Sequence, residues 1–342
     1  ILTRSPLTLE MGLLLTRKWR LERLMINIGL LLYITRKKIS HTIFKRKYNE
    51  WTCVHKYGKE ADKTFYCIRR EGDAAGLFSY ILYVLEKIEI ADKNNYYPVI
   101  DMQNQINSYL YPWEVGRINS WEYYFEQPSG IGLKELRKCR NVIYSDTKCR
   151  CKVGSLIFYD SNAMEKWTCL FEKYIHLNKH VKQYIDNAYA KKMGKGGERI
   201  LGVLARGTDY NAGPALHPVQ PDVETIIKDA KRLMKEKNLS KLFLATEDED
   251  IFTRFKCEFQ NQLIAVDTPR YKGTERITQR KNDRKKDKYL QGLDYLTTIY
   301  LLAKCQCLLA GNTNGSLGAG LINAQKYEYI YIYSLGNYPE RK

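Results

Sequence analysis

The sequence predicts an α/β protein with two doubly wound domains that face each other across a cleft. Segments rich in β-forming residues alternate with segments of helical apolar spacing through much of the chain. Polar or glycine-containing loops follow the predicted strands, where sheets of this kind bind their ligands. The length of 342 residues exceeds one ordinary domain and suits two.

Residues 1–60 are basic and helix-forming in composition, and we expect a basic helical segment here. The chain carries a formal net charge of +18, and one of its two basic blocks lies in this segment. The apolar stretch 24–35 is about a dozen residues long, short of the roughly 20 that span a bilayer. Two interpretations stay open: an ordinary packed helix, or a helix lying on a membrane surface.

The first doubly wound domain is expected at 61–195. Residues 64–70 predict a strand, 77–91 a helix and 97–102 a second strand. A strand, helix and strand in this order form the opening unit of a parallel sheet. Further along, residues 167–193 are expected to be helical.

The second doubly wound domain is expected at 196–342, where strands and helices alternate regularly. The predicted strands are 199–205, 241–245, 263–266, 305–310 and 329–333. The predicted helices are 222–237, 249–260, 291–304 and 316–325. A charged loop is expected at 276–288.

The first candidate site follows the strand 199–205. Arg206 can pair bidentately with a phosphate, and Thr208 can add a hydroxyl donor. Gly207 lets the backbone approach a ligand, and Asp209 can hold Arg206 in place or contact the substrate. The alternative is a strand-end turn with a local ion pair between Arg206 and Asp209.

Three further candidates lie in the loops of the second domain. His217 can act as an acid, a base or a phosphate donor, or it can be merely exposed. Thr246 and Asp248 follow the strand 241–245. The Asp248 carboxylate can accept hydrogen bonds from a guanine edge or a ribose, or both residues can cap the next helix. Asp248 and Asp250 also match a D-x-D metal motif, but the surrounding pattern does not support it, and we expect no metal.

The loop between the strand 305–310 and the next helix is the most phosphate-like segment of the chain. Small polar residues at a helix N-terminus form an anion site from free backbone N–H groups, although an ordinary capped turn has the same composition. The candidate binding residues of this loop are Thr313, Asn314, Gly315 and Ser316.

In the first domain the loop 71–76 joins a predicted strand to a predicted helix. Glu71 and Asp73 place carboxylates at this strand end, and either is a candidate general base for an acceptor hydroxyl. Gly76 opens the helix and is a candidate for contact with the bound ligand.

Composition narrows the remaining function classes. The excess of basic residues favours binding to polyanions. The sequence contains no recognisable nucleic-acid-binding module, however, and we expect no nucleic-acid partner. The nine cysteines form no zinc-type spacing and suit reduced thiols in the cytoplasm. The sequence shows no cleavable signal pattern and no hydrolase, zinc-protease or kinase motif.

The order of these segments resembles the superfamily of α1,2-, α1,6- and protein O-fucosyltransferases over roughly residues 64–335. Residues 204–209 (LARGTD) are similar to its H-x-R-R-x-D motif, and 245–248 (ATED) to its A-T-D-D sequence, whose acid reads the guanine. The loop 313–316 resembles its diphosphate-binding loop, and 76–80 (GLFSY) its glycine-rich loop. The motif's histidine is absent, and Gly207 replaces its second arginine.

The resemblance implies two Rossmann-like domains in a GT-B arrangement and an inverting, metal-independent glycosyltransferase without a cofactor. It implies a nucleotide-sugar donor, best GDP-fucose, with Arg206 in the place of the family's key arginine. Our candidate catalytic residues are Arg206 and Asp209 of this motif, with Glu71 and Asp73 of the first-domain loop as the general-base candidates. We expect a bacterial-type enzyme that acts on a glycan or lipid-linked surface-polysaccharide acceptor. It is expected in the cytoplasm, with peripheral association at the inner face of the membrane. The alternatives are a non-catalytic basic protein that binds membrane or nucleic acid, and a sulfotransferase-like enzyme.

Overall fold

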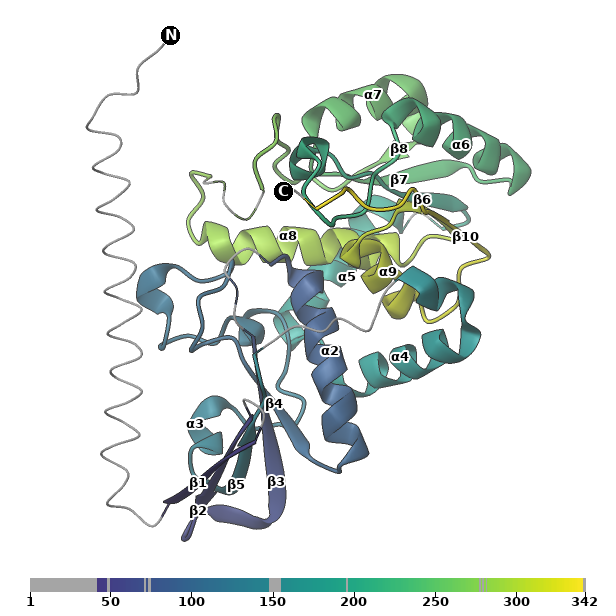
Figure 1. The fold of residues 1–342 in the computed structure, drawn as a ribbon. Helices are drawn as coiled ribbons and strands as arrows, with labels where there is room; N and C mark the ends of the chain where they lie inside the picture. The colour runs from purple at the N-terminus through teal and green to yellow at the C-terminus, as the bar shows by residue number, and fades with distance from the viewer. Residues whose placement is uncertain are drawn as a thin grey trace, which may run out of the picture.

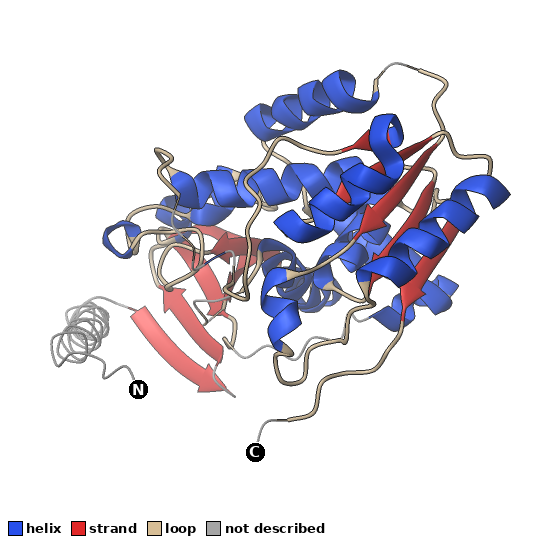
Figure 2. Cartoon of the chain, turned by 90° about the horizontal axis from the view of Figure 1, so that it is seen from above, coloured by secondary structure: helices blue, strands red, loops and turns tan. Residues whose placement is uncertain are grey.

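Two five-stranded sheets, with helices packed between and around them, make up the fold (Figures 1 and 2). The computed structural model describes residues 42–47, 50–70, 72, 75–147, 155–194, 196–276, 278, 280 and 282–340. The predicted α/β class with two sheets is confirmed. The domain boundaries at 60/61 and 195/196 stay predictions.

The second sheet is parallel throughout, with the order β8-β7-β6-β9-β10. Its strands are β6 (Ile200–Leu204), β7 (Lys241–Ala245), β8 (Leu263–Ile264), β9 (Cys307–Gly311) and β10 (Tyr329–Tyr333). The chain runs outward from β6 to β8 and then crosses to the other side of β6. A topological switch point therefore lies between β6 and β9, the position at which doubly wound sheets bind ligands.

Helices cover both faces of this sheet, as the sequence alternation predicts. One face packs under α6 (Val223–Glu236) and α7 (Glu249–Phe259), and the other under α8 (Asp287–Leu302). The fourth helix, α9 (Asn314–Asn323), begins a few residues after the end of β9 in the chain. Successive residues of β6 alternate between the two cores: Leu201 and Val203 face α6, whereas Ile200 and Leu204 face α8.

The first sheet is mixed, with the order β1-β2-β5-β3-β4. Its strands are β1 (Thr42–Lys47), β2 (Glu50–His55), β3 (Lys59–Arg69), β4 (Tyr97–Asp101) and β5 (Cys139–Tyr144). Strands β3, β4 and β5 are parallel, as a doubly wound domain requires, but β1 and β2 form an antiparallel hairpin at the edge. The predicted parallel unit at 64–102 is confirmed, whereas the antiparallel hairpin adds two strands that the sequence did not predict.

The hairpin also corrects the prediction of a helical segment at 1–60, which is wrong for β1 and β2. Strand β1 (TIFKRK) has three β-forming residues followed by three basic ones, and β2 (EWTCVH) is rich in β-forming residues. This composition suits a hairpin at a sheet edge, where charged side chains are common. The remaining part of that prediction, with the apolar stretch 24–35, lies outside the described residues. Within the described residues, every helix is too short or too polar to span a bilayer.

Three helices of the first half form the contact between the two sheets. They are α2 (Leu77–Lys93), α4 (Ser161–Tyr174) and α5 (Lys179–Met193), and they pack against α8 and α9 (Figure 1). The predicted helix 167–193 is in fact two helices, because the chain turns after α4 and the Asn178 side chain caps α5. One hydrophobic core runs through this contact, so the packing itself holds the two halves against each other.

The remaining helical elements of the described residues are short. They are α3 (Leu133–Leu136) and the 3₁₀ turns at Pro112–Glu114, Ser120–Tyr123, Ser155–Tyr159, Thr208–Ala212 and Gln260–Gln262. The turn Thr208–Ala212 follows β6 directly, so the chain bends sharply at the switch point.

Candidate functional site

A cleft of about 1040 Å³ lies between the two halves, at the carboxyl ends of β6 and β7. From the first half it is lined by Arg70, Gly72, Ala75, Gly76, Phe78, Ser79 and Tyr109. From the second half its wall includes residues after β6, after β7 and at the start of α9. Its position at the switch point and its size suit a ligand as large as a nucleotide sugar.

Arg206 is the central cation of this cleft. Its Nε atom donates to Oε1 of Glu247 at 2.9 Å, its Nη2 atom donates to Oδ1 of Asp209 at 3.1 Å, and its guanidinium stacks over Tyr210 at 4.8 Å. Burial alone would lower the pKa of Arg206, but Glu247, Tyr295, Tyr210 and Asp209 outweigh it and raise that pKa above its ordinary value. Arg206 is therefore a fixed, permanently charged group, placed where an anion can reach it.

Gly207 and Thr208, which follow Arg206 in the turn after β6, have structural roles. Thr208 is fully buried, and its hydroxyl lies within hydrogen-bond distance of two carboxylates, Asp209 Oδ1 at 3.2 Å in the same turn and Glu247 Oε1 at 3.1 Å after β7. A side chain on Gly207 would place its Cβ 2.6 Å from Cβ and Cγ of Asp248. No second arginine fits at this position, and Thr208 supports the turn without lining the cleft.

Of the two acids after β7, Glu247 lines the cleft and Asp248 does not. Asp248 is buried: its Oδ1 accepts from the backbone N–H groups of Asp250 and Ile251, and its Oδ2 accepts from Thr208 N–H at 3.0 Å. The structure thus gives Asp248 the capping role, with its oxygens turned away from a ligand. Thr246 does line the cleft and accepts from the Asp248 N–H at 3.2 Å.

The loop after β9 meets the cleft at the N-terminus of α9. Thr313 and Asn314 line the cleft, whereas Gly315 and Ser316 lie behind them. Thr313 and Ser316 form a reciprocal capping box: Ser316 N–H donates to Thr313 Oγ1 at 3.2 Å, and Thr313 N–H donates to Ser316 Oγ at 3.0 Å. The box fixes the start of the helix and leaves the N–H groups of Asn314 and Gly315 without intrahelical partners.

His217 also lines the cleft, where its ring contacts that of Tyr210. Its Nδ1 lies 3.0 Å from the carbonyl oxygen of Ala215, and because a carbonyl can only accept, Nδ1 carries the proton in this contact. The Nε2 atom of the neutral ring is then an acceptor, able to receive a hydrogen bond or a proton.

Gly76 also lines the cleft, at the N-cap of α2, where an added Cβ would meet nothing within 4 Å. Glu71 and Asp73, the predicted general bases, lie outside the described residues. Among the predicted residues, the structure therefore brings Arg206, Asp209, His217, Thr246, Thr313, Asn314 and Gly76 to one cleft.

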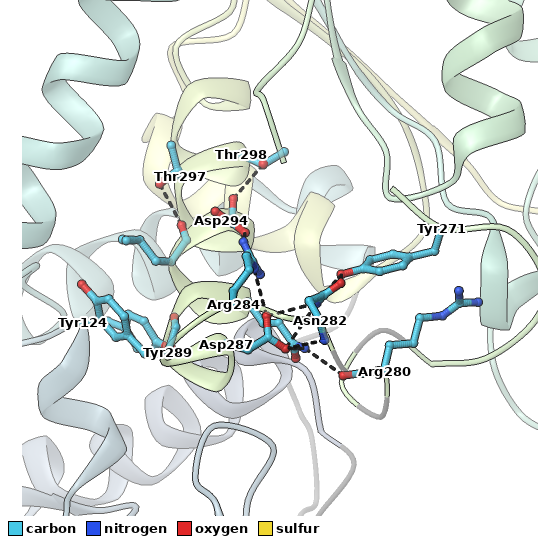
Figure 3. A network of polar contacts seen from close by, with 12 residues as sticks. Tyr124, Tyr271, Arg280, Asn282, Arg284, Asp287, Tyr289, Asp294, Thr297 and Thr298 are labelled. Carbon is cyan, nitrogen blue, oxygen red and sulfur yellow. Dashed lines mark hydrogen bonds and ion pairs between the residues drawn. The ribbon is translucent and has the colours of Figure 1, made fainter. Parts of the chain in front are cut away.

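A second charged cluster lines the cleft from α8 and the segment before it (Figure 3). Arg284 lies between two carboxylates: its Nη1 donates to Asp294 at 2.7 Å and its Nε to Asp287 at 2.9 Å. Asp287 also accepts from Asn282 and Gln291. Burial raises the pKa of the Asp294 carboxyl above its ordinary value, although Arg284 opposes this shift.

The sequence analysis did not identify several lining residues: Arg70, Glu247, Tyr271, Arg276, Arg284, Gln291, Asp294 and Tyr295. Most lie within a helix or a long charged loop, where no motif marks them. Tyr295 lines the cleft with Arg206, and burial raises the pKa of Tyr295 to about 12 although Arg206 opposes it. Within the described residues, no three potential metal-binding side chains form a cluster.

No protein-family model matches the sequence, and no curated protein matches it. Similar solved structures do exist. The fucosyltransferase NodZ from Bradyrhizobium superposes with a TM-score of 0.51 at 17% identity, covering 80% of this chain and 96% of NodZ. NodZ α1,6-fucosyltransferase soaked with GDP-fucose gives a TM-score of 0.48 at 18% identity, covering 76% and 93%. POFUT1 in complex with GDP gives 0.46 at 8% identity, covering 80% and 99%.

The match to NodZ at 0.51 extends over nearly the whole of that enzyme, and at this low identity it establishes the architecture. The resemblance that the sequence motifs indicate is confirmed at the level of the fold. The chain has the two-sheet, fucosyltransferase-like fold of NodZ.

Proposed function

We propose that the chain is a glycosyltransferase that takes its sugar from a nucleotide-sugar donor, with GDP-fucose as the preferred donor. The observation that carries the proposal is the position of Arg206. It is fixed at the switch point of a parallel sheet, and it lines the same cleft as the N-terminus of α9. A guanidinium and a helix N-terminus together form a site for a diphosphate.

The choice of fucose follows the fold. NodZ is a fucosyltransferase, and the motif order of this chain resembles the same superfamily. In the proposed complex, Arg206 and the N–H group of Asn314 hold the diphosphate. They stabilise the negative charge that develops there as the bond to the sugar breaks.

Transfer also requires a group that takes the proton of the acceptor hydroxyl. His217 is our candidate among the described residues, because its Nδ1 is held by Ala215 and its Nε2 is an acceptor on the cleft wall. The acceptor oxygen attacks C1 of the sugar and gives its proton to Nε2, and the electron pair of the broken bond stays on the diphosphate. Attack from the face opposite the diphosphate inverts the anomeric centre.

We propose a glycan or a lipid-linked oligosaccharide as the acceptor. We also propose a cytoplasmic enzyme held at the inner face of the membrane by its basic N-terminal segment. Both proposals rest on the sequence, since residues 1–41 of that segment lie outside the described residues.

A panel of nucleotides tests the proposed function by thermal shift. GDP should stabilise the protein more than UDP, CMP or adenosine 3′,5′-bisphosphate does. At a concentration of one hundred times its Kd, GDP should raise the free energy of unfolding by about 2.7 kcal/mol over that of the unliganded protein. Preference for the adenosine bisphosphate would instead favour a sulfotransferase-like enzyme. No response to any nucleotide would favour a non-catalytic basic protein.

A further inference from the structure

The charges that line the cleft are unequally neutralised. Four arginines line it: Arg70, Arg206, Arg276 and Arg284. Arg206 is paired with Glu247 and Asp209, and Arg284 is paired with Asp287 and Asp294. Among the described residues, Arg70 and Arg276 make no ion pair. Because Arg206 and Arg284 are paired with carboxylates, these two side chains attract an anion less strongly than two unpaired arginines would.

The two unpaired arginines differ in their freedom. Arg70 is held by helix α2, since its Nη1 donates to the carbonyl oxygen of Ser79 at 2.6 Å and its guanidinium stacks over Tyr80 and Tyr83. Arg276 is half-buried, and its guanidinium makes no hydrogen bond within the described part of the chain. It is the lining arginine that can move to meet a ligand.

Backbone contacts place the segment of Arg276 next to the Arg206 site. Tyr271 N–H donates to the carbonyl oxygen of Glu247 at 2.8 Å, and Glu249 N–H donates to that of Tyr271 at 3.1 Å. Arg206, Arg276 and Tyr210 all line the cleft, and Arg206 stacks over Tyr210. Burial raises the pKa of Tyr210, and both cations oppose this shift. Arg206 and Arg276 therefore face the same region of the cleft.

We propose that Arg276 is the second guanidinium that binds the diphosphate of the donor, beside Arg206. This inference rests on the proposed function. Arg206 is oriented by Glu247 and Asp209 and shares its charge with them, whereas Arg276 brings a full charge without a competing carboxylate. A bidentate contact to a phosphate is the geometry that a guanidinium favours.

Binding of GDP and of guanosine to three variants tests this role. Arg276→Gln removes the charge, and Arg276→Lys keeps it without the planar fork. Lys272→Gln is the matched control: it removes one charge from the same segment, but Lys272 is exposed, lies outside the cleft lining and makes only a loose pair with Asp250. Because Arg276 has no ion-pair or hydrogen-bond partner among the described residues and the Lys272–Asp250 pair is exposed and loose, all three unliganded variants should unfold at the wild-type temperature.

Arg276→Gln should raise the Kd for GDP about tenfold or more and leave the Kd for guanosine, which has no phosphate, nearly unchanged. Arg276→Lys should fall between wild type and Arg276→Gln, and Lys272→Gln should match wild type. If wild type binds GDP and Arg276→Gln binds it equally well, this inference is wrong and the proposed function stands. An equal loss of GDP and guanosine binding would also overturn the inference. A wild-type protein that does not bind GDP would overturn both.

Discussion

Oε1 of Glu247 accepts three hydrogen bonds from the turn after β6: from Arg206 Nε at 2.9 Å, from Gly207 N–H at 3.1 Å and from the Thr208 hydroxyl at 3.1 Å. One carboxylate oxygen thus ties the end of β7 to the end of β6 and fixes the guanidinium in the cleft. The arrangement positions Arg206 before any ligand arrives, which is the condition under which a charge stabilises a leaving group most effectively.

Gly207 is expected to be sensitive to the smallest substitution. In Gly207→Ala the added Cβ would overlap Asp248, whose carboxylate caps α7 and accepts from Thr208 N–H. Either the turn or the cap must shift, at a cost of about 1–3 kcal/mol in the free energy of unfolding. Urea unfolding measures the loss. Gly76→Ala is the control, since its Cβ would meet nothing, and equal stability of the two variants would contradict the contact.

His217 is expected to act in the proton transfer and not in binding the donor. In His217→Asn the amide nitrogen can still donate to Ala215, but the acceptor at Nε2 is lost. We expect kcat to fall about 10²–10⁴-fold, as loss of a general base does, with little change in the Kd for GDP. Steady-state kinetics and GDP titration separate the two effects. Unchanged kcat would remove His217 from the mechanism.

Thr313 combines a structural role with a binding role. Thr313→Ala removes the N-cap of α9 and should cost about 1 kcal/mol of stability, and Thr313→Ser should restore most of it. Because the cap also holds the N–H groups of the first turn toward the cleft, Thr313→Ala should weaken GDP binding as well. Asp222→Ala removes the N-cap of α6, away from the cleft, and should lower stability without changing GDP binding.

The contact between α2 and α4 should depend on pH. Lys173 donates to Asp92 at 2.7 Å and Tyr174 donates to it at 2.6 Å, and these two bonds lower the pKa of Asp92 below its ordinary value. A lowered carboxyl pKa stabilises the fold above the unfolded-state pKa of about 4, and this contribution is lost as the pH falls further. Asp92→Asn should therefore reduce stability at pH 7 and converge with wild type near pH 2. A constant difference across this range would argue against the shift.

The second half of the fold could be predicted closely from sequence because its elements are local and regular. Strands β7 and β10 have the predicted bounds, since short apolar runs with turn signals on both sides are typical of buried parallel strands. Strand β5 was missed because Arg140 and Asn141 interrupt its apolar pattern. Its place in the sheet depends on pairing with β2 and β3, which is a long-range property.

The candidate site, too, could be predicted only where local sequence determines the position of a residue. Arg206, Thr313 and Asn314 follow strands, so their chain position alone brings them to the cleft. Glu247 and Asp248 are adjacent, and sequence cannot decide which one turns to the ligand. That choice depends on the backbone path into α7, where Asp248 becomes the N-cap. Asp294 and Arg284 reach the cleft only through the packing of α8, which no short motif encodes.

The most direct test of the proposed function is the affinity of the protein for GDP when Arg206 is replaced. Isothermal titration should show binding by wild type and at least about a hundredfold weaker binding by Arg206→Ala, because a buried charge-assisted contact to the diphosphate is lost. Arg232→Ala removes an exposed arginine of α6 that pairs only with Asp229 and Glu236, and it should bind GDP as wild type does. Equal GDP affinity of Arg206→Ala and wild type would contradict the account.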